Sequence, residues 1–149
     1  MDSQPPIWFR PFTLDEINRR GANTMVEHLG IVFTEIAVHH VTAEMPVDER
    51  TKQPLGLLHG GASVALAETV GSTAANLCVD FDHAFCVGME INANHVRPVR
   101  TGKVVARAEP VHIGRKSHVW SIRITDDRDR LVCISRLTMS VVRREEQMQ

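Results

Sequence analysis

One segment constrains the fold more than any other part of this chain. Residues 57–78 read LLHGGASVALAETVGSTAANLC, and their alanine, leucine, glutamate and serine content favours a helix. Small side chains occur on every side of that helix, so other elements can pack closely around it. We therefore expect one long, buried central helix in a chain of 149 residues, a length typical of one domain.

Strand-like runs flank this helix on both sides. The run 41–47 alternates apolar and polar residues, and with 31–38 it predicts a hairpin around His39 and His40. Four further runs follow the helix, at 84–94, 103–113, 116–126 and 131–143. Their connections are too short for crossover helices, so we expect antiparallel pairing in a four-strand meander.

The resulting order, ββαββββ, predicts an α+β fold in which a sheet with one apolar face wraps around the long helix. That is the layout of the hotdog fold. Thr13 and Glu16 have the spacing of a capping box, so a short helix should begin there and end by Gly21, and a second short turn should span 24–29. We expect one domain over 1–149, with 1–12 as an N-terminal extension and 144–149 as a polar tail.

Composition and spacing exclude several classes of function. The net charge of −1 argues against nucleic acid as a partner, and no run reaches the roughly 18 apolar residues of a membrane span. Three cysteines without CxxC spacing suggest a reducing compartment, and we predict a cytoplasmic protein. No HxxxH or HxxEH pattern is present, so the sequence predicts no metal. A Gly-x-Ser-x-Gly elbow is also absent.

The start of the long helix carries the first chemical signal. His59, Gly60 and Gly61 stand where a loop enters the helix, and the first N–H groups of a helix have no partners within it. Glycine lets an acyl group approach these donors, and the helix dipole favours a developing oxyanion. The alternative for His59 is a capping histidine satisfied by the backbone, and the glycines could merely permit tight packing.

Glu68 is the second signal, since it is the only acid between His59 and Val79. Ser72 follows four residues later and shares its helix face. A lone acid among apolar residues is costly unless it has a partner or a catalytic task, so a structural pairing with an arginine is the alternative. Ser72 could equally be a small residue in an interface.

The spacing of these signals has a further consequence. Gly60 and Glu68 are eight residues apart, which is about 12 Å along a helix. One subunit therefore cannot bring both to one carbonyl group. If both act on one substrate, they come from two helices that meet antiparallel about a two-fold axis, which predicts a homodimer.

Residues 53–69 (QPLGLLHGGASVALAET) and 23–31 (NTMVEHLGI) resemble the PaaI-like group of hotdog-fold thioesterases, and the likeness extends from Ile7 onward. Segments 43–47, 86–90 and 92–98 most resemble the branch with 1,4-dihydroxy-2-naphthoyl-CoA thioesterases and enterobactin-pathway proofreading thioesterases. In one place the chain departs from this pattern, because Asn94 precedes His95 where relatives often carry paired histidines.

The resemblance implies roles for individual residues. Glu68 would be the nucleophile or general base, and the Gly60 amide would polarise the thioester carbonyl. Gln53 and His59 would orient the substrate, while Ser72 would position the carboxylate or the attacking water. Substrate and CoA contacts are implied for Gly61, Gly88, His95, Arg97, His112, Gly114, Arg115, Lys116 and Ser117, with Arg115 and Lys116 suited to phosphate.

The implied activity is hydrolysis of an aromatic or medium-length acyl-CoA to the free acid and CoA. CoA is part of the substrate, and no cofactor is expected. The family resemblance also implies that two homodimers pair into a tetramer. The alternatives are a proofreading thioesterase acting on acyl-carrier-protein thioesters, a hotdog dehydratase, and a non-catalytic acyl-CoA binding module.

Overall fold

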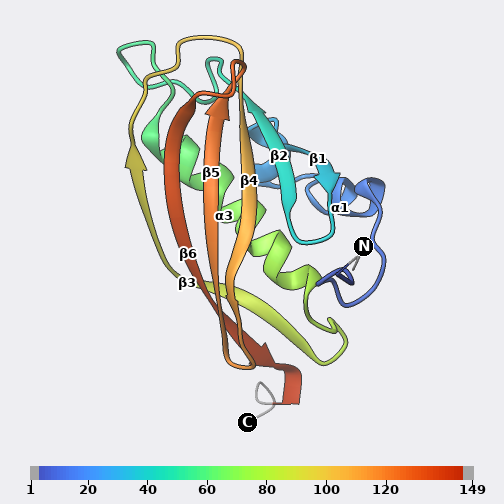
Figure 1. The fold of residues 1–149 in the computed structure, drawn as a ribbon. Helices are drawn as coiled ribbons and strands as arrows, with labels where there is room; N and C mark the ends of the chain where they lie inside the picture. The colour runs from blue at the N-terminus through green and yellow to red at the C-terminus, as the bar shows by residue number, and fades with distance from the viewer. Residues whose placement is uncertain (1–3, 146–149) are drawn as a thin grey trace.

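A computed structural model describes residues 4–145 and shows one long helix held inside a curved sheet (Figure 1). The strands and the long helix follow the expected order ββαββββ, which confirms the α+β hotdog fold. The elements are α1 (Leu14–Arg20), α2 (Met25–His28), β1 (Val32–Ile36), β2 (Val41–Pro46), α3 (Gly60–Leu77), β3 (Ala84–His95), β4 (Lys103–Ile113), β5 (Ser117–Asp126) and β6 (Leu131–Arg143).

The strand order in the sheet is β1-β2-β4-β5-β6-β3, with every neighbouring pair antiparallel. The expected four-strand meander is therefore wrong for β3, which pairs with β6 and not with β4. The reason is that β2 and β5 occupy both edges of β4. Residues 96–102 carry the chain across one end of the sheet, from the edge strand β3 past β6 and β5 to β4 (Figure 1). This arrangement leaves β3 at an edge.

The core lies between α3 and the concave face of the sheet. On β2, the alternate residues Val41, Ala43 and Met45 are fully buried, as the period of a strand with one covered face requires. Leu66 and Val70 of α3 are buried as well. Among residues 4–145, no helix is long and apolar enough to cross a membrane.

The N-terminal segment belongs to this core. The Trp8 ring stacks on the buried Trp120 ring with 6.5 Å between centroids, and Trp8 Nε1 donates to the Ala37 carbonyl at 2.7 Å. Phe9 N–H donates to the Leu77 carbonyl at 2.8 Å, so the segment joins the β1–β2 turn to the end of α3. Of the predicted polar tail, only residues 144 and 145 lie in the described range.

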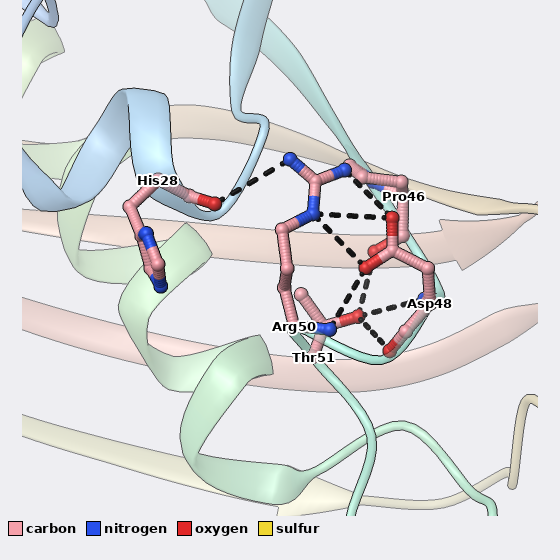
Figure 2. Close-up of polar contacts among 5 residues, drawn as sticks. All are labelled: His28, Pro46, Asp48, Arg50 and Thr51. Carbon is pink, nitrogen blue, oxygen red and sulfur yellow. Dashed lines mark hydrogen bonds and ion pairs between the residues drawn. The ribbon is translucent and has the colours of Figure 1, made fainter.

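The loop after β2 is held by a polar network that fixes the entrance to α3 (Figure 2). Arg50 forms an ion pair with Asp48 at 2.6 Å and also donates to the His28 carbonyl at 3.4 Å. The buried Thr51 hydroxyl donates to the Pro46 carbonyl at 2.8 Å and accepts from Asp48 N–H at 3.1 Å. The Thr51 carbonyl in turn accepts from His59 N–H at 2.8 Å, so the network positions His59, the residue immediately before α3.

We expect Thr51→Val to destabilise the protein by about 1–3 kcal/mol, because two part-buried backbone groups, Pro46 O and Asp48 N–H, lose their partner while the side-chain volume is kept. Urea unfolding measures the change. Thr34→Val is the matched control, since the Thr34 side chain is exposed and its hydroxyl makes only a 3.5 Å bond to the Thr42 carbonyl. Equal midpoints for the native protein and Thr51→Val would contradict this role.

Candidate active site

The start of α3 leaves one backbone donor free. His59 is the N-cap residue, and its Nδ1 accepts from Gly61 N–H at 2.8 Å. The capping interpretation of His59 is therefore confirmed, and its Nε2 carries the proton in the neutral ring. Within residues 4–145, no acceptor lies in hydrogen-bonding range of Gly60 N–H. Gly60 is thus the residue at this helix start that can donate to a ligand.

A hollow of about 350 Å³ lies in front of this donor. Gln53, Gly60, His95 and Arg97 line it together, although they come from a loop, from α3 and from the end of β3. The His95 ring packs so closely on Gly60 that a Cβ atom at residue 60 would lie 2.9 Å from His95 Nε2. The structure therefore brings four of the predicted site residues to one place.

Glu68 lies two turns further along α3, on the face that the sheet leaves partly uncovered. Its carboxylate is half-buried, and no cation or hydrogen-bond donor contacts it within the described part of the chain. A pairing with arginine is thus not found there. Burial raises the pKa of the Glu68 carboxyl above its usual value. A carboxylate in this state is poised to accept a proton or to attack a carbonyl.

Gly88 provides the space for this carboxylate. It lies at a bulge in β3, where the register with β6 shifts, and a Cβ atom at this position would overlap Glu68 Oε1. Bulges next to sites often redirect a side chain. Because residue 88 has no side chain, the Glu68 carboxylate can lie directly against the β3 backbone at this position.

We expect Gly88→Ala to lower the rate of thioester hydrolysis about 10- to 100-fold, since a carboxylate displaced by about 1 Å loses its alignment. The fold should tolerate the change because the overlapping atom is the end of a flexible side chain. Steady-state kinetics and a thermal melt test this together. If the rate loss occurs through Glu68, combining Gly88→Ala with Glu68→Gln costs no more than Glu68→Gln alone.

Ser72 shares the helix face of Glu68 but does not bond to it. Its hydroxyl donates to Met139 Sδ at 3.7 Å, and no hydrogen bond joins Ser72 to Glu68 in the described residues. Met139 is the β6 partner of Gly88, so both Glu68 and Ser72 contact one row of the sheet. A role for Ser72 toward water or carboxylate stays a prediction.

The β4–β5 turn forms a separate basic hollow of about 460 Å³. Arg115 and Lys116 line it, as does Arg143 from the end of β6. No sequence motif indicates Arg143, because its proximity to this turn depends on the pairing of β5 with β6. His112, Gly114 and Ser117 shape the same turn, in which Gly114 N–H donates to the Ser117 carbonyl at 2.9 Å.

The predicted site residues thus form three groups in one chain: the hollow at the start of α3, the Glu68 face with Gly88, and the basic turn. A further apolar hollow of about 730 Å³ adjoins Ser72 and was not predicted from the sequence. Phe33, Phe81 and Phe85 line it, with Arg20 and Arg144 as its cations.

A hotdog fold with a free amide at the helix start and a lone carboxylate on the same helix is the arrangement expected of a hotdog thioester hydrolase, since the amide can stabilise an oxyanion. Residues 55–133 match the model of the Thioesterase superfamily. The 1,4-dihydroxy-2-naphthoyl-CoA hydrolase of Escherichia coli K12 is 50% identical over 136 residues, which cover 91% of this chain and 99% of that protein.

Solved structures agree with this assignment. A glutamine-to-alanine variant of a Pseudomonas aeruginosa thioesterase has a TM-score of 0.91 and 49% identity, covering 92% of this chain and 99% of that one. A Haemophilus influenzae thioesterase has a TM-score of 0.89 and 50% identity, covering 92% and 95%. The chain therefore belongs to the Thioesterase superfamily and is a thioester hydrolase.

Proposed function

We propose that this protein hydrolyses an aromatic acyl-CoA to the free acid and CoA, with Glu68 as its catalytic carboxylate. The observation that carries the proposal is the half-buried Glu68 carboxylate, which has no counter-ion in the described chain and stands over Gly88. Its environment suits reaction with a substrate better than a structural ion pair.

Two routes are open to this carboxylate. Glu68 attacks the thioester carbonyl and expels the CoA thiolate, after which water hydrolyses the mixed anhydride and restores Glu68. Alternatively, Glu68 removes a proton from a water molecule that attacks the carbonyl directly. In both routes the carbonyl oxygen becomes negative, and the Gly60 N–H donates to it at the positive end of the α3 dipole.

The active site in this proposal is shared between two subunits. Gly60 and Glu68 are about 12 Å apart along α3, too far for one carbonyl. Two features of the chain support a dimer: β3 is an edge strand that exposes Val87 and Met89, and the Glu68 face of α3 is only partly covered. Antiparallel α3 helices would place the Gly60 amide of each subunit near Glu68 of the other. A pairing of two such dimers stays a prediction.

The hollow beside Ser72 supports an aromatic acyl group. Its volume of about 730 Å³ lies in the range of small-molecule sites, and its walls are mainly apolar. Arg144 stands 4.5 Å from the Phe81 ring centroid, so aromatic faces and a cation occur together there. The E. coli relative acts, by its name, on a naphthoyl-CoA. The basic turn at Arg115, Lys116 and Arg143 suits the phosphates of CoA.

Free-thiol release from a panel of thioesters tests the proposal. We expect turnover of benzoyl- and naphthoyl-type CoA esters with kcat/KM at least about tenfold above that for straight-chain acyl-CoAs, because stacking adds to area burial. The same acyl groups on a carrier protein should react more slowly if the basic turn binds CoA. Binding of acyl-CoA without any thiol release would contradict the proposal and favour a binding module.

A further inference from the structure

A second cluster of polar side chains lies at the β1–β2 turn. One ligand atom from each of His39, His40 and Glu109 lies within 4.8 Å of the other two. The strand register explains why they meet: Val41 of β2 pairs with Ala108 of β4, so His40, just before β2, lies opposite Glu109 of β4. Glu109 is 69 positions from His40, which is why the local histidine patterns in the sequence gave no sign of it.

The two ring nitrogens of His40 are in different situations. Nε2 lies 3.0 Å from Glu35 Oε2, whereas the buried Nδ1 has no hydrogen-bond partner among the described residues. A carboxylate oxygen of Glu35 accepts in this hydrogen bond. Nε2 therefore carries the proton in the neutral ring, and Nδ1 presents a lone pair.

This arrangement is the one that metal-binding histidines adopt. Such a histidine donates its second ring N–H to a carboxylate, which fixes the ring and raises its basicity as a ligand. Glu35 supplies that carboxylate, and the Thr42 hydroxyl holds it with a 3.2 Å hydrogen bond. An otherwise unpaired buried nitrogen costs free energy, and a metal ion would satisfy it.

Each of the other two ligands keeps a donor atom open to an ion. His39 is exposed, and its ring meets the His40 ring edge to face at 5.6 Å between centroids. The Arg107 guanidinium donates to Glu109 Oε1 at 2.6 Å, and Oε2 of Glu109 accepts no hydrogen bond in the described chain. Zinc takes bond lengths of about 2.0–2.2 Å, so the proposed site requires the His39 and Glu109 side chains to rotate toward the ion.

The backbone around the cluster is already fixed. Ala37 N–H donates to the His40 carbonyl at 2.9 Å and closes the turn, while Ile7 N–H and Trp8 Nε1 donate to the carbonyls of Val38 and Ala37. Because Val41 faces α3, His40 lies on the opposite side of the sheet, away from Glu68 and Gly60.

We propose that His39, His40 and Glu109 bind one zinc-type divalent transition-metal ion, which ties the β1–β2 turn to β4. Two imidazoles and a carboxylate are the ligand types that zinc takes, with water as the fourth ligand. The site lies apart from the thioester chemistry, which it should leave unchanged.

Equilibrium dialysis of the untagged full-length chain against Zn²⁺, with Mg²⁺ in excess, tests the proposal. We expect close to one zinc ion per chain, and loss of that ion in the double variant His39→Gln, His40→Gln. Glu35→Gln should weaken binding about tenfold, because it removes only the group that orients His40. His83→Gln is the matched control, since His83 is exposed and pairs with Asp80 at 2.8 Å in a separate loop.

A thermal melt gives a second readout. Zinc should raise the Tm of the native chain and of His83→Gln but not that of the double variant, since a ligand that binds only the folded state stabilises it. Thiol release should be the same for the native chain and the double variant. Zinc binding that survives in the double variant, or that is lost equally in His83→Gln, would overturn the proposal, as would a native chain that binds no zinc.

Discussion

Glu68→Gln is expected to reduce thioester hydrolysis by at least about a hundredfold, the scale of a lost acid–base group. Glutamine keeps the size of the side chain, so the fit over Gly88 is unchanged while the charge is removed. Thiol release under saturating substrate measures the loss. A variant that turns over as fast as the native protein would exclude Glu68 from the chemistry.

The pKa of Glu68 supplies an internal check on the same residue. Burial raises it, so the folded state favours the protonated carboxyl. Activity needs the ionised form, and the acid limb of kcat/KM should therefore fall as the pH drops through a value above the usual one for glutamate. The same burial penalises the charged form at neutral pH, so Glu68→Gln should unfold at an equal or higher urea concentration than the native protein. Loss of activity then cannot be attributed to loss of folding.

Local signals were enough to predict the elements of this fold. The small residues of 57–78 predicted α3, and the alternation from Val41 to Val47 predicted β2, because burial on one side imposes these periods. The neighbour of β3 was not predictable in this way. Alternation shows which face of a strand is buried, but it does not show which strand lies beside it. Whether β3 pairs with β4 or with β6 depends on β2, which occupies one edge of β4 through a pairing between residues far apart in the sequence.

In the candidate site too, positions within one element were predictable from the sequence, and positions that depend on strand pairing were not. Gly60 and Glu68 lie on one helix, so helix geometry alone gives the distance between them. Neither the Gly60 N–H nor the Glu68 carboxylate has a hydrogen-bond or ion-pair partner in the described chain. Met139 and Arg143 acquire their places through the pairing of β3, β5 and β6, to which no short motif corresponds. The family resemblance named Gly88, but as a substrate contact and not as the residue beside Glu68. His59 shows the limit of motif reasoning, since its ring nitrogen caps the helix whatever further role the residue has.

Gly60→Pro is the second change with a large expected effect, because it removes the free N–H; it also adds a Cβ atom 2.9 Å from His95 Nε2, so the His95 ring must shift slightly. Proline is well tolerated at the first position of a helix, where Gly60 stands. His59 already has the extended backbone, with φ −68° and ψ 131°, that a residue before proline prefers. We expect hydrolysis to fall about 100- to 1000-fold, the effect of losing one oxyanion donor, while the fold is retained. Gly60→Ala, which adds the same Cβ atom beside His95 but keeps the Gly60 N–H, is the matched control and should lose less.

Mixed dimers of Gly60→Pro and Glu68→Gln then decide whether the site is shared. If each site takes its amide from one subunit and its carboxylate from the other, a mixed dimer holds one intact site and one site with both defects. Co-expression with two different tags, followed by tandem purification, should therefore recover about half of the native rate per dimer. If each chain instead supplied both groups to its own site, every site in the mixed dimer would carry a defect, and the activity would stay as low as that of the parent variants.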